Sequence, residues 1–296
     1  MTRPDMARAA STRSDAALAW SRAGGPAAPV CRNCGVESFA AARDPAWPCP
    51  ICTDERQFPE PAGQAWLSQE DLRGYRIDVR RLGGGAYALS VAPKAGIGQT
   101  AYLVWSGDGW VLWDPLPKVD DAALAARIAS ADGCGAGLGG ITVEASHPHM
   151  FGAQSSWAAA CSGTVYVNEA DSQWVDAQSF PYRFWSGTVR VGDRVELVQL
   201  GGHFPGSSYL VWRSFDGAEW LFVSDTTQIR PNGRFCFQWS YPNALPLGEG
   251  EVRSMLARLP AFAPTRAFDN FGHTISGDVR EVIVQSALRH LERIRA

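Results

Sequence analysis

Four cysteines near the N-terminus are spaced like the ligands of a metal ion. Cys31 and Cys34 form one C-x-x-C pair, and Cys49 and Cys52 form a second pair after 14 intervening residues. Each such turn presents two sulfurs to one ion, and two turns complete a tetrahedron of thiolates. This donor set suits either zinc or iron. We favour zinc, because nothing else in the sequence resembles a series of redox centres. We expect the site to be structural, because a segment of this size cannot stabilise itself by burial alone.

Histidine and aspartate side chains form a second group of candidate ligands. They lie in glycine- or turn-rich loops, mostly at the end of a predicted strand, at His147, His149, His203, Asp225 and His273. His147 and His149 are two residues apart, and such residues point the same way in an extended backbone. Both imidazoles can therefore reach one ion, and the position of a third histidine and an aspartate at strand ends predicts a metal site. His290 lies on a predicted helix without a partner pattern, and we expect no metal there.

Short runs of β-branched and aromatic residues predict the strands that position these loops. The predicted strands span 75–82, 87–91, 101–105, 110–113, 141–145, 164–167, 195–200, 208–212 and 220–223. Apolar spacing and capping residues predict helices over 121–132, 154–160, 248–259 and 278–294, and a Ser-x-x-Asp start predicts a short connecting helix over 68–75. Strand-rich halves that are interrupted and closed by helices indicate packed layers of helix and sheet.

The composition of the chain limits the classes of partner that we expect it to bind. The 296 residues are 46% hydrophobic and 19% charged, with a formal net charge of −3. The lack of a basic excess argues against nucleic acid as a partner. There is no apolar run of transmembrane length or secretory character, and paired cysteine knuckles suit a reducing compartment. We therefore expect a cytoplasmic protein that acts on a small molecule, with neither nucleic acid nor membrane as its partner.

The chain divides into four predicted segments. Residues 1–28 read as a disordered tail, 29–60 as the four-cysteine ribbon, 61–74 as a connector and 75–296 as one continuous domain. The tail is rich in Ala, Arg and Ser, and it lacks the apolar stretch of a secretory signal. Asp5 and Asp15 argue against an organellar transit peptide. Prolines break any long element in the ribbon segment.

The histidine motifs resemble those of the metallo-β-lactamase superfamily. The resemblance covers residues 75–296 and rests on S-H-P-H at 146–149, G-H-F-P-G-S at 202–207 and V-S-D-T at 223–226. It implies an αββα sandwich, a mixed α/β fold in four layers, with metals held by loops along one edge of the two sheets.

The same resemblance implies a role for each candidate ligand. His147, His149 and His203 would form a three-histidine metal site. Asp225 would bridge to a second metal, to which His273 would also belong. Asp114 resembles the family's aspartate that supports the metal loop. The cysteine segment resembles a zinc ribbon or the iron-binding knuckles of rubrerythrins.

The sequence departs from the family at the second metal. The family's first motif reads H-x-H-x-D-H, and here Phe151 and Gly152 stand in its last two positions. Neither residue can bind a metal, and Asp225 with His273 supplies too few ligands for tight binding. The usual two-metal mechanism therefore cannot be carried over.

We expect a mononuclear metal-dependent hydrolase that cleaves an ester, thioester, lactone or amide bond. Zinc held by three histidines, His203 among them, would keep its fourth position for water and lower the pKa of that water to about 7. Asp225 would orient the water or act as general base. One alternative is an iron dioxygenase with a triad of His147, His203 and Asp225. The other is a non-catalytic binding protein with a degenerate metal site.

Overall fold

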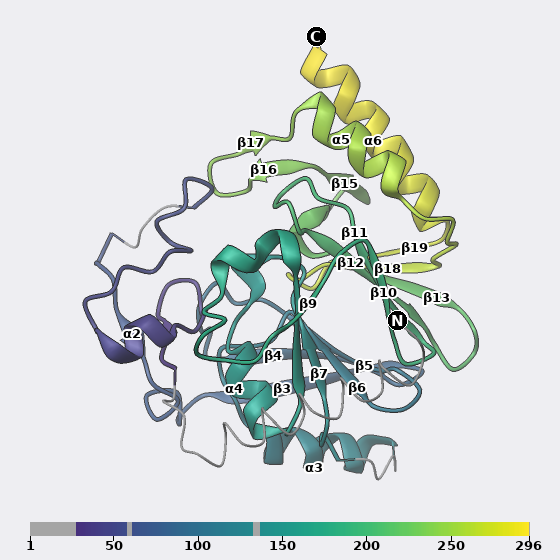
Figure 1. Ribbon diagram of the computed structural model, residues 1–296. Coiled ribbons are helices and arrows are strands. Elements are labelled where there is room, and N and C mark those ends of the chain that lie inside the picture. Colours follow the sequence, from purple (N-terminus) through teal and green to yellow (C-terminus); the bar gives the residue numbers. More distant parts are fainter. Residues whose placement is uncertain (1–27, 58–60, 133–136, 296) are drawn as a thin grey trace.

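The computed structural model describes residues 28–57, 61–132 and 137–295. The predicted tail at 1–28 lies outside these residues except for Ala28, and so does Cys134. Two large β-sheets lie face to face, with helices on their outer faces and a small cysteine-bearing segment against one side (Figure 1). No helix in the described part of the chain combines the length and the apolar character that a bilayer span requires.

The first sheet contains seven strands in the order β3 to β9. Their bounds are β3 Arg76–Gly83, β4 Ala86–Ala92, β5 Ala101–Trp105, β6 Trp110–Trp113, β7 Thr142–Glu144, β8 Thr164–Asn168 and β9 Arg183–Trp185. Strands β3 to β6 pair antiparallel, whereas β6 to β9 pair parallel. The carboxyl ends of the parallel strands therefore open at one edge of the sheet, where the segment after β7 begins.

The second sheet has the order β10-β11-β12-β13-β18-β19. Its strands are β10 Thr188–Val191, β11 Val195–Gln199, β12 Ser208–Arg213, β13 Glu219–Phe222, β18 Arg266–Phe268 and β19 Thr274–Ser276. Two hairpins follow β13: β14 Gln228–Arg230 with β15 Arg234–Cys236, and β16 Gln238–Ser240 with β17 Leu245–Pro246. Short 3₁₀ turns at η1 Pro148–Met150, η2 Glu169–Trp174 and η3 Ser224–Thr226 interrupt the connections.

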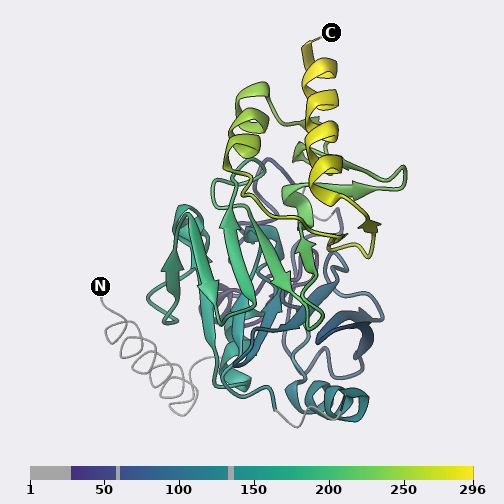
Figure 2. The same cartoon turned by 90° about the vertical axis from the view of Figure 1, so that its right-hand side faces the viewer.

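Helices cover the outer face of each sheet, as two perpendicular views show (Figures 1 and 2). The helices are α3 Asp121–Asp132 and α4 Gln154–Ala160 on the first sheet, and α5 Glu249–Arg258 and α6 Val279–Arg295 on the second. Alternate side chains of the strands point to opposite faces. Trp113 and Trp212 accordingly meet between the sheets, whereas Leu112 packs outward with Trp157 of α4. The result is an αββα sandwich, as predicted.

The cysteine-bearing segment docks on the first half of the sandwich. Its strand β1 Val30–Cys31 pairs with β2 Trp66–Leu67, and α2 Phe39–Arg43 lies between them in sequence. We call residues 28–57 with 61–67 the cysteine module. Glu37 joins the module to α4: its backbone N–H donates to the carbonyl of Gly152, and its carboxylate accepts from the N–H groups of Ser155 and Ser156 at the start of α4. A helix N-terminus leaves such N–H groups without partners of its own.

Most predicted elements occur within one or two residues of their expected bounds, but the connecting helix predicted over 68–75 is wrong. Ser68 and Asp71 do form the reciprocal hydrogen bonds of a helix start, with Ser68 N–H donating to Asp71 at 2.8 Å and Asp71 N–H to Ser68 at 3.2 Å. Only turns follow, because Gly74 and the start of β3 at Arg76 leave no room for a second helical turn.

Replacing Glu37 by Ala should separate the module from α4. The change removes the acceptor of the α4 N–H groups, and leaving such buried donors unpaired should lower the free energy of unfolding by about 1 to 3 kcal/mol. Urea unfolding of the metal-loaded protein measures this value. The exposed Glu55 provides the control, since Glu55→Ala removes a carboxylate of the same module without a helix start behind it. Equal effects of the two substitutions would contradict this role of Glu37.

Candidate functional site

The four predicted cysteine ligands lie together in the module. Cys31, Cys34, Cys49 and Cys52 are all buried, with their sulfurs within 4.8 Å of one another. The Cys31–Cys52 and Cys34–Cys49 sulfur pairs are each 3.6 Å apart. Sulfurs bound at about 2.3 Å to one tetrahedral ion lie about 3.8 Å from each other. Side-chain amides of Asn33 and Gln64 donate to two of the sulfurs at 3.4 Å. The cluster therefore has the size and the polar support of a four-thiolate metal site.

Three imidazoles converge at the edge where the two sheets meet. His147 follows β7, His149 lies in η1 and His203 lies in the loop after β11. Each residue is 1% exposed, and the ring centroids are 4.8 to 5.3 Å apart. One nitrogen of each ring lies within 4.8 Å of the other two. The structure thus brings together the three histidines that the motifs predicted.

Hydrogen bonds decide which nitrogen is free in two of the three rings, His203 and His147. The carbonyl of Gln238 can only accept, so Nδ1 of His203 carries the proton at 3.1 Å and Nε2 is left bare. Nδ1 of His147 bonds to the Ser146 hydroxyl at 2.9 Å, and its buried Nε2 has no hydrogen-bond partner in the described structure.

The facing nitrogens are spaced for one ion. Nδ1 of His149 faces Nε2 of His203 at 3.4 Å. Two nitrogens bound to a tetrahedral zinc lie about 3.3 to 3.4 Å apart. The site fits a metal held by Nε2 of His147, Nδ1 of His149 and Nε2 of His203.

Burial keeps the three imidazoles neutral. It lowers the pKa of His203 to about 4, and it lowers the pKa of His147 and His149 well below the usual histidine range. The charges of neighbouring rings and of Arg56 lower the pKa of His147 and His149 further. Neutral imidazole is the form that binds a metal, so near neutral pH no proton competes with the ion.

The Asp225 carboxylate lies beside the imidazoles rather than among them. Its Oδ2 is 4.0 Å from Nε2 of His147. Among the described residues, the group of mutually close ligand atoms contains the three imidazoles and no carboxylate. Burial, together with the charges of Asp114 and Asp269, raises the pKa of Asp225 well above the usual range. A raised pKa makes the ionised carboxylate a stronger proton acceptor than an exposed aspartate.

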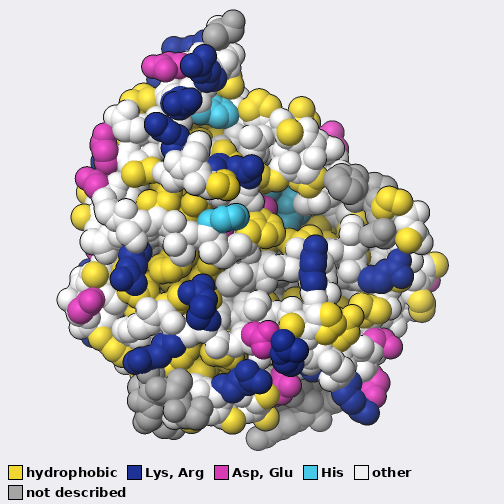
Figure 3. Space-filling view, turned by 180° about the vertical axis from the view of Figure 1, so that it is seen from behind, with side chains coloured by type: hydrophobic (Ala, Val, Ile, Leu, Met, Phe, Trp, Pro, Cys, Tyr) yellow, Lys and Arg dark blue, Asp and Glu magenta, His cyan; other side chains and the backbone are white. Residues whose placement is uncertain are grey.

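His273 is held elsewhere. Its Nδ1 is 2.8 Å from Oδ2 of the fully buried Asp269, and its side chain is 43% exposed. Oδ1 of Asp269 accepts from the N–H groups of Phe271 and His273, so this carboxylate organises the loop. Histidine side chains are visible on the face shown in Figure 3. The structure does not bring His273 into the imidazole group, and its metal-binding role stays a prediction.

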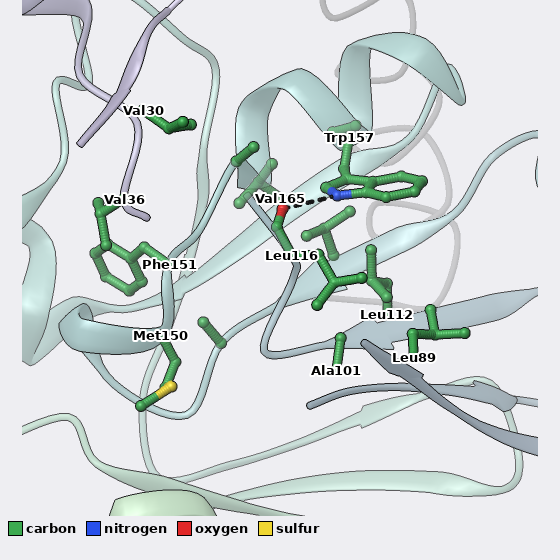
Figure 4. Close-up of a cluster of buried hydrophobic side chains, with 14 of the residues drawn as sticks. Val30, Val36, Leu89, Ala101, Leu112, Leu116, Met150, Phe151, Trp157 and Val165 are labelled. Carbon is green, nitrogen blue, oxygen red and sulfur yellow. Dashed lines mark hydrogen bonds between the residues drawn. The ribbon is translucent and has the colours of Figure 1, made fainter. Parts of the chain in front are cut away.

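Packing occupies the two positions where the family has second-metal ligands. Gly152 has φ +50, and a Cβ atom there would lie 1.9 Å from the carbonyl oxygen of Pro115. Phe151 is 3% exposed and lies next to Val36 of the cysteine module (Figure 4). A side chain at Gly152 would therefore require the Pro115 backbone to move, and Phe151 packs toward the module.

Two buried carboxylates hold the imidazole loops in place. Asp114 accepts the N–H of Ser146, next to His147, at 2.8 Å, and burial raises the pKa of Asp114 to about 7. Asp171 accepts the N–H of Gly206 in the His203 loop at 2.9 Å. A Cβ at Gly206 would lie 2.5 Å from this carboxylate, which explains the glycine. The support by Asp114 was expected, whereas nothing in the sequence around Asp171 signalled its role.

The module also places two residues at the site that the sequence did not reveal. Nε2 of Gln57 is 3.0 Å from Nδ1 of His149. The Arg56 guanidinium lies 4.0 Å from the centre of the Phe204 ring, which in turn packs against all three imidazoles. Both residues belong to an irregular loop without periodicity or motif, so only the folded chain brings them to the histidines.

Comparisons with known proteins agree on the fold. No family model matches the sequence. The uncharacterized protein YmaE of Bacillus subtilis (strain 168) is 31% identical over 274 residues, which cover 90% of this chain and 97% of YmaE. The structure of the DIM-1 metallo-β-lactamase exposed to ceftazidime matches with a TM-score of 0.51 at 12% identity, over 74% of this chain and 98% of that one. The structure of TMB-1 matches with a TM-score of 0.52 at 14% identity, over 74% and 99%. The fold is that of the metallo-β-lactamases, as the motifs predicted.

Metal content should follow the two ligand groups. We expect one ion in the cysteine cluster and one at the imidazoles, counted by elemental analysis of protein purified without chelator. Replacing Cys31 and Cys34 by Ser should remove one ion and destabilise the fold, because binding of a structural metal is also folding free energy. His203→Ala should remove the other ion and leave the protein folded. Equal unfolding of both variants would contradict this division.

Gly152→His should not restore a second metal at the imidazole site. The new side chain meets the Pro115 carbonyl, so we expect a loss of stability on thermal unfolding and an unchanged metal count. Gly109→His is a matched control, since a Cβ at Gly109 meets nothing within 4 Å. A third ion in the Gly152→His protein would show that the loop can rearrange to bind it.

Proposed function

We propose that this chain, which belongs to the same family as Bacillus subtilis YmaE and has the metallo-β-lactamase fold, is a hydrolase that uses one metal ion. The observation that carries the proposal is the set of three neutral, buried imidazoles, one nitrogen of each within 4.8 Å of the other two and one facing pair at the 3.4 Å spacing of a single tetrahedral ion. We propose zinc as the ion. The proposed substrate is a small molecule with an ester, thioester, lactone or amide bond, and the proposed compartment is the cytoplasm.

A metal with three imidazole ligands supplies a Lewis acid and lowers the pKa of a bound water to about 7. Asp225 then has the position of a proton acceptor. Its carboxylate adjoins Nε2 of His147, and Nε2 of Gln228 donates to its other oxygen at 3.4 Å, which fixes its orientation. The raised pKa of Asp225 makes it a stronger base than an exposed aspartate. We propose that it orients the attacking water and accepts its proton.

The packing around Phe151 and Gly152 supports a mononuclear site. The backbone carbonyl of Pro115 leaves no room for a side chain at Gly152, and the side chain of Val36 packs on Phe151. In a site with one metal a side chain of the protein must orient the attacking water, and the Asp225 carboxylate lies beside the imidazoles.

Hydrolysis should need neither oxygen nor reductant. In a screen of small esters, thioesters, lactones and amides, activity should rise with pH as the activated water ionises and then level off. His147→Ala should abolish it with loss of the ion. Asp225→Asn should lower turnover by a factor of about 10² to 10⁴ while metal content is kept.

The matched control for Asp225→Asn is Asp193→Asn, at a side chain that is 80% exposed. This control should keep full activity. The iron dioxygenase makes the opposite prediction, since Asp225 would then be a direct ligand. Strict oxygen dependence, together with loss of the ion in Asp225→Asn, would refute the hydrolase.

A further inference from the structure

We propose that Gln57 of the cysteine module is a fourth ligand of the metal at the three imidazoles, so that the module closes the site. The proposal rests on the metal site of the proposed function. It concerns a residue outside the sandwich, in the loop that follows the second cysteine pair. The side-chain amide of Gln57 lies against the one ring nitrogen of His149 that faces the other imidazoles.

The position of the amide fits a ligand. Its terminal atom is 3.0 Å from Nδ1 of His149, and that Nδ1 is 3.4 Å from Nε2 of His203. The oxygen and nitrogen of an amide exchange places when the group turns by half a revolution. The turn brings Oε1 to the same place, and neighbouring oxygen and nitrogen ligands of one tetrahedral zinc lie about 3.3 Å apart. Three imidazoles and this oxygen complete four positions.

The backbone around Gln57 is held from two sides. On the module side, the N–H of Gln57 donates to the carbonyl of Asp54 at 2.9 Å, close after the Cys49–Cys52 turn. On the sandwich side, the Ser240 hydroxyl of β16 donates to the carbonyl of Arg56 at 2.7 Å. The Asn243 amide also donates to the carbonyl of Glu55 at 3.3 Å. The loop therefore presents Gln57 in one place instead of leaving it as a loose side chain.

The Arg56 side chain adds a second anchor beside the site. Its guanidinium lies over the Phe204 ring at 4.0 Å and near the Trp239 ring at 5.3 Å, and its Nη1 bonds to both carboxylate oxygens of Asp54 at 3.2 Å. A guanidinium over an aromatic face is an attractive contact. Arg56 thus ties the loop to the ring that packs against the imidazoles, with Gln57 as the next residue.

A fourth protein ligand changes what the site can do. Zinc sites with four protein ligands are closed, whereas catalytic zinc sites keep one position open. In the arrangement described here, water or substrate must displace Gln57 to reach the ion. Because Gln57 is five residues beyond Cys52, the metal of the cysteine cluster fixes the loop that delivers it. The cysteine module would then act on the active site and not only on stability.

Azide binding to cobalt at the imidazoles tests the fourth position. The full-length protein keeps zinc in its cysteine cluster and receives Co²⁺ at the imidazole site after mild chelation, and visible absorption of the cobalt reports its ligands. We expect Gln57→Ala to bind azide at least about tenfold more tightly than the unchanged protein, because a site that is mostly closed binds in proportion to its open fraction. Gln57→Glu should resemble the unchanged protein, since a carboxylate is also a ligand.

Gln178→Ala, at an exposed glutamine, is the matched control and should leave azide binding unchanged. Equal azide affinity and equal cobalt spectra for the unchanged protein and Gln57→Ala would overturn the proposal, while the bound cobalt would leave the three-imidazole site of the hydrolase intact. Failure of the unchanged protein to bind cobalt at the imidazoles would overturn both proposals.

Discussion

Three buried imidazole nitrogens that face one another impose the main constraint on this structure. Nε2 of His147 is buried without a hydrogen-bond partner in the described structure, and such an atom costs free energy unless a cation or a proton lies between the rings. Protonation is disfavoured because burial lowers the pKa of each imidazole. The Gln238 carbonyl further fixes which nitrogen of His203 is bare. A metal ion bound between the rings would remove this cost in free energy. The groups that hold the rings in place therefore all serve one metal site.

The strand pairing of the two sheets fixes the positions of the loops that carry the imidazoles. Because β6 and β7 run parallel, Asp114 and the His147 loop emerge at the same edge, and the N–H of Asp114 bonds to the carbonyl of Glu144 at 3.0 Å. The N–H of Ser208, at the start of β12, donates to the carbonyl of Ser146 at 3.0 Å. The Ser208 hydroxyl donates to the same carbonyl at 3.3 Å, so two bonds link the His147 loop of one sheet to the strand that follows the His203 loop of the other. The distance between the imidazoles is therefore set by backbone hydrogen bonds.

The sequence could predict what depends on local pattern and spacing. Strands 101–105 and 110–113 and helix 154–160 occur with their predicted bounds, and the two C-x-x-C pairs and the H-x-H pair pointed to groups that the fold brings together. It could not predict Asp171 or Gln57, because each reaches the imidazole site through a loop whose course depends on tertiary contacts. The prediction of a helix over 68–75 was wrong for a related reason. The residues carry a helix-start signal, but a strand begins shortly after Gly74 and no helix can continue there.

The cysteine module packs against the two residues that stand where the metallo-β-lactamase motif has ligands of a second metal. In the family's motif the two residues after H-x-H-x turn inward as ligands, whereas here Phe151 packs on Val36 and the Gly152 carbonyl accepts from Glu37 of the module. Inward-facing ligands at these positions would remove the surface on which the module docks. The docked module also places the side chain of Gln57 3.0 Å from His149, where we propose that it is a metal ligand.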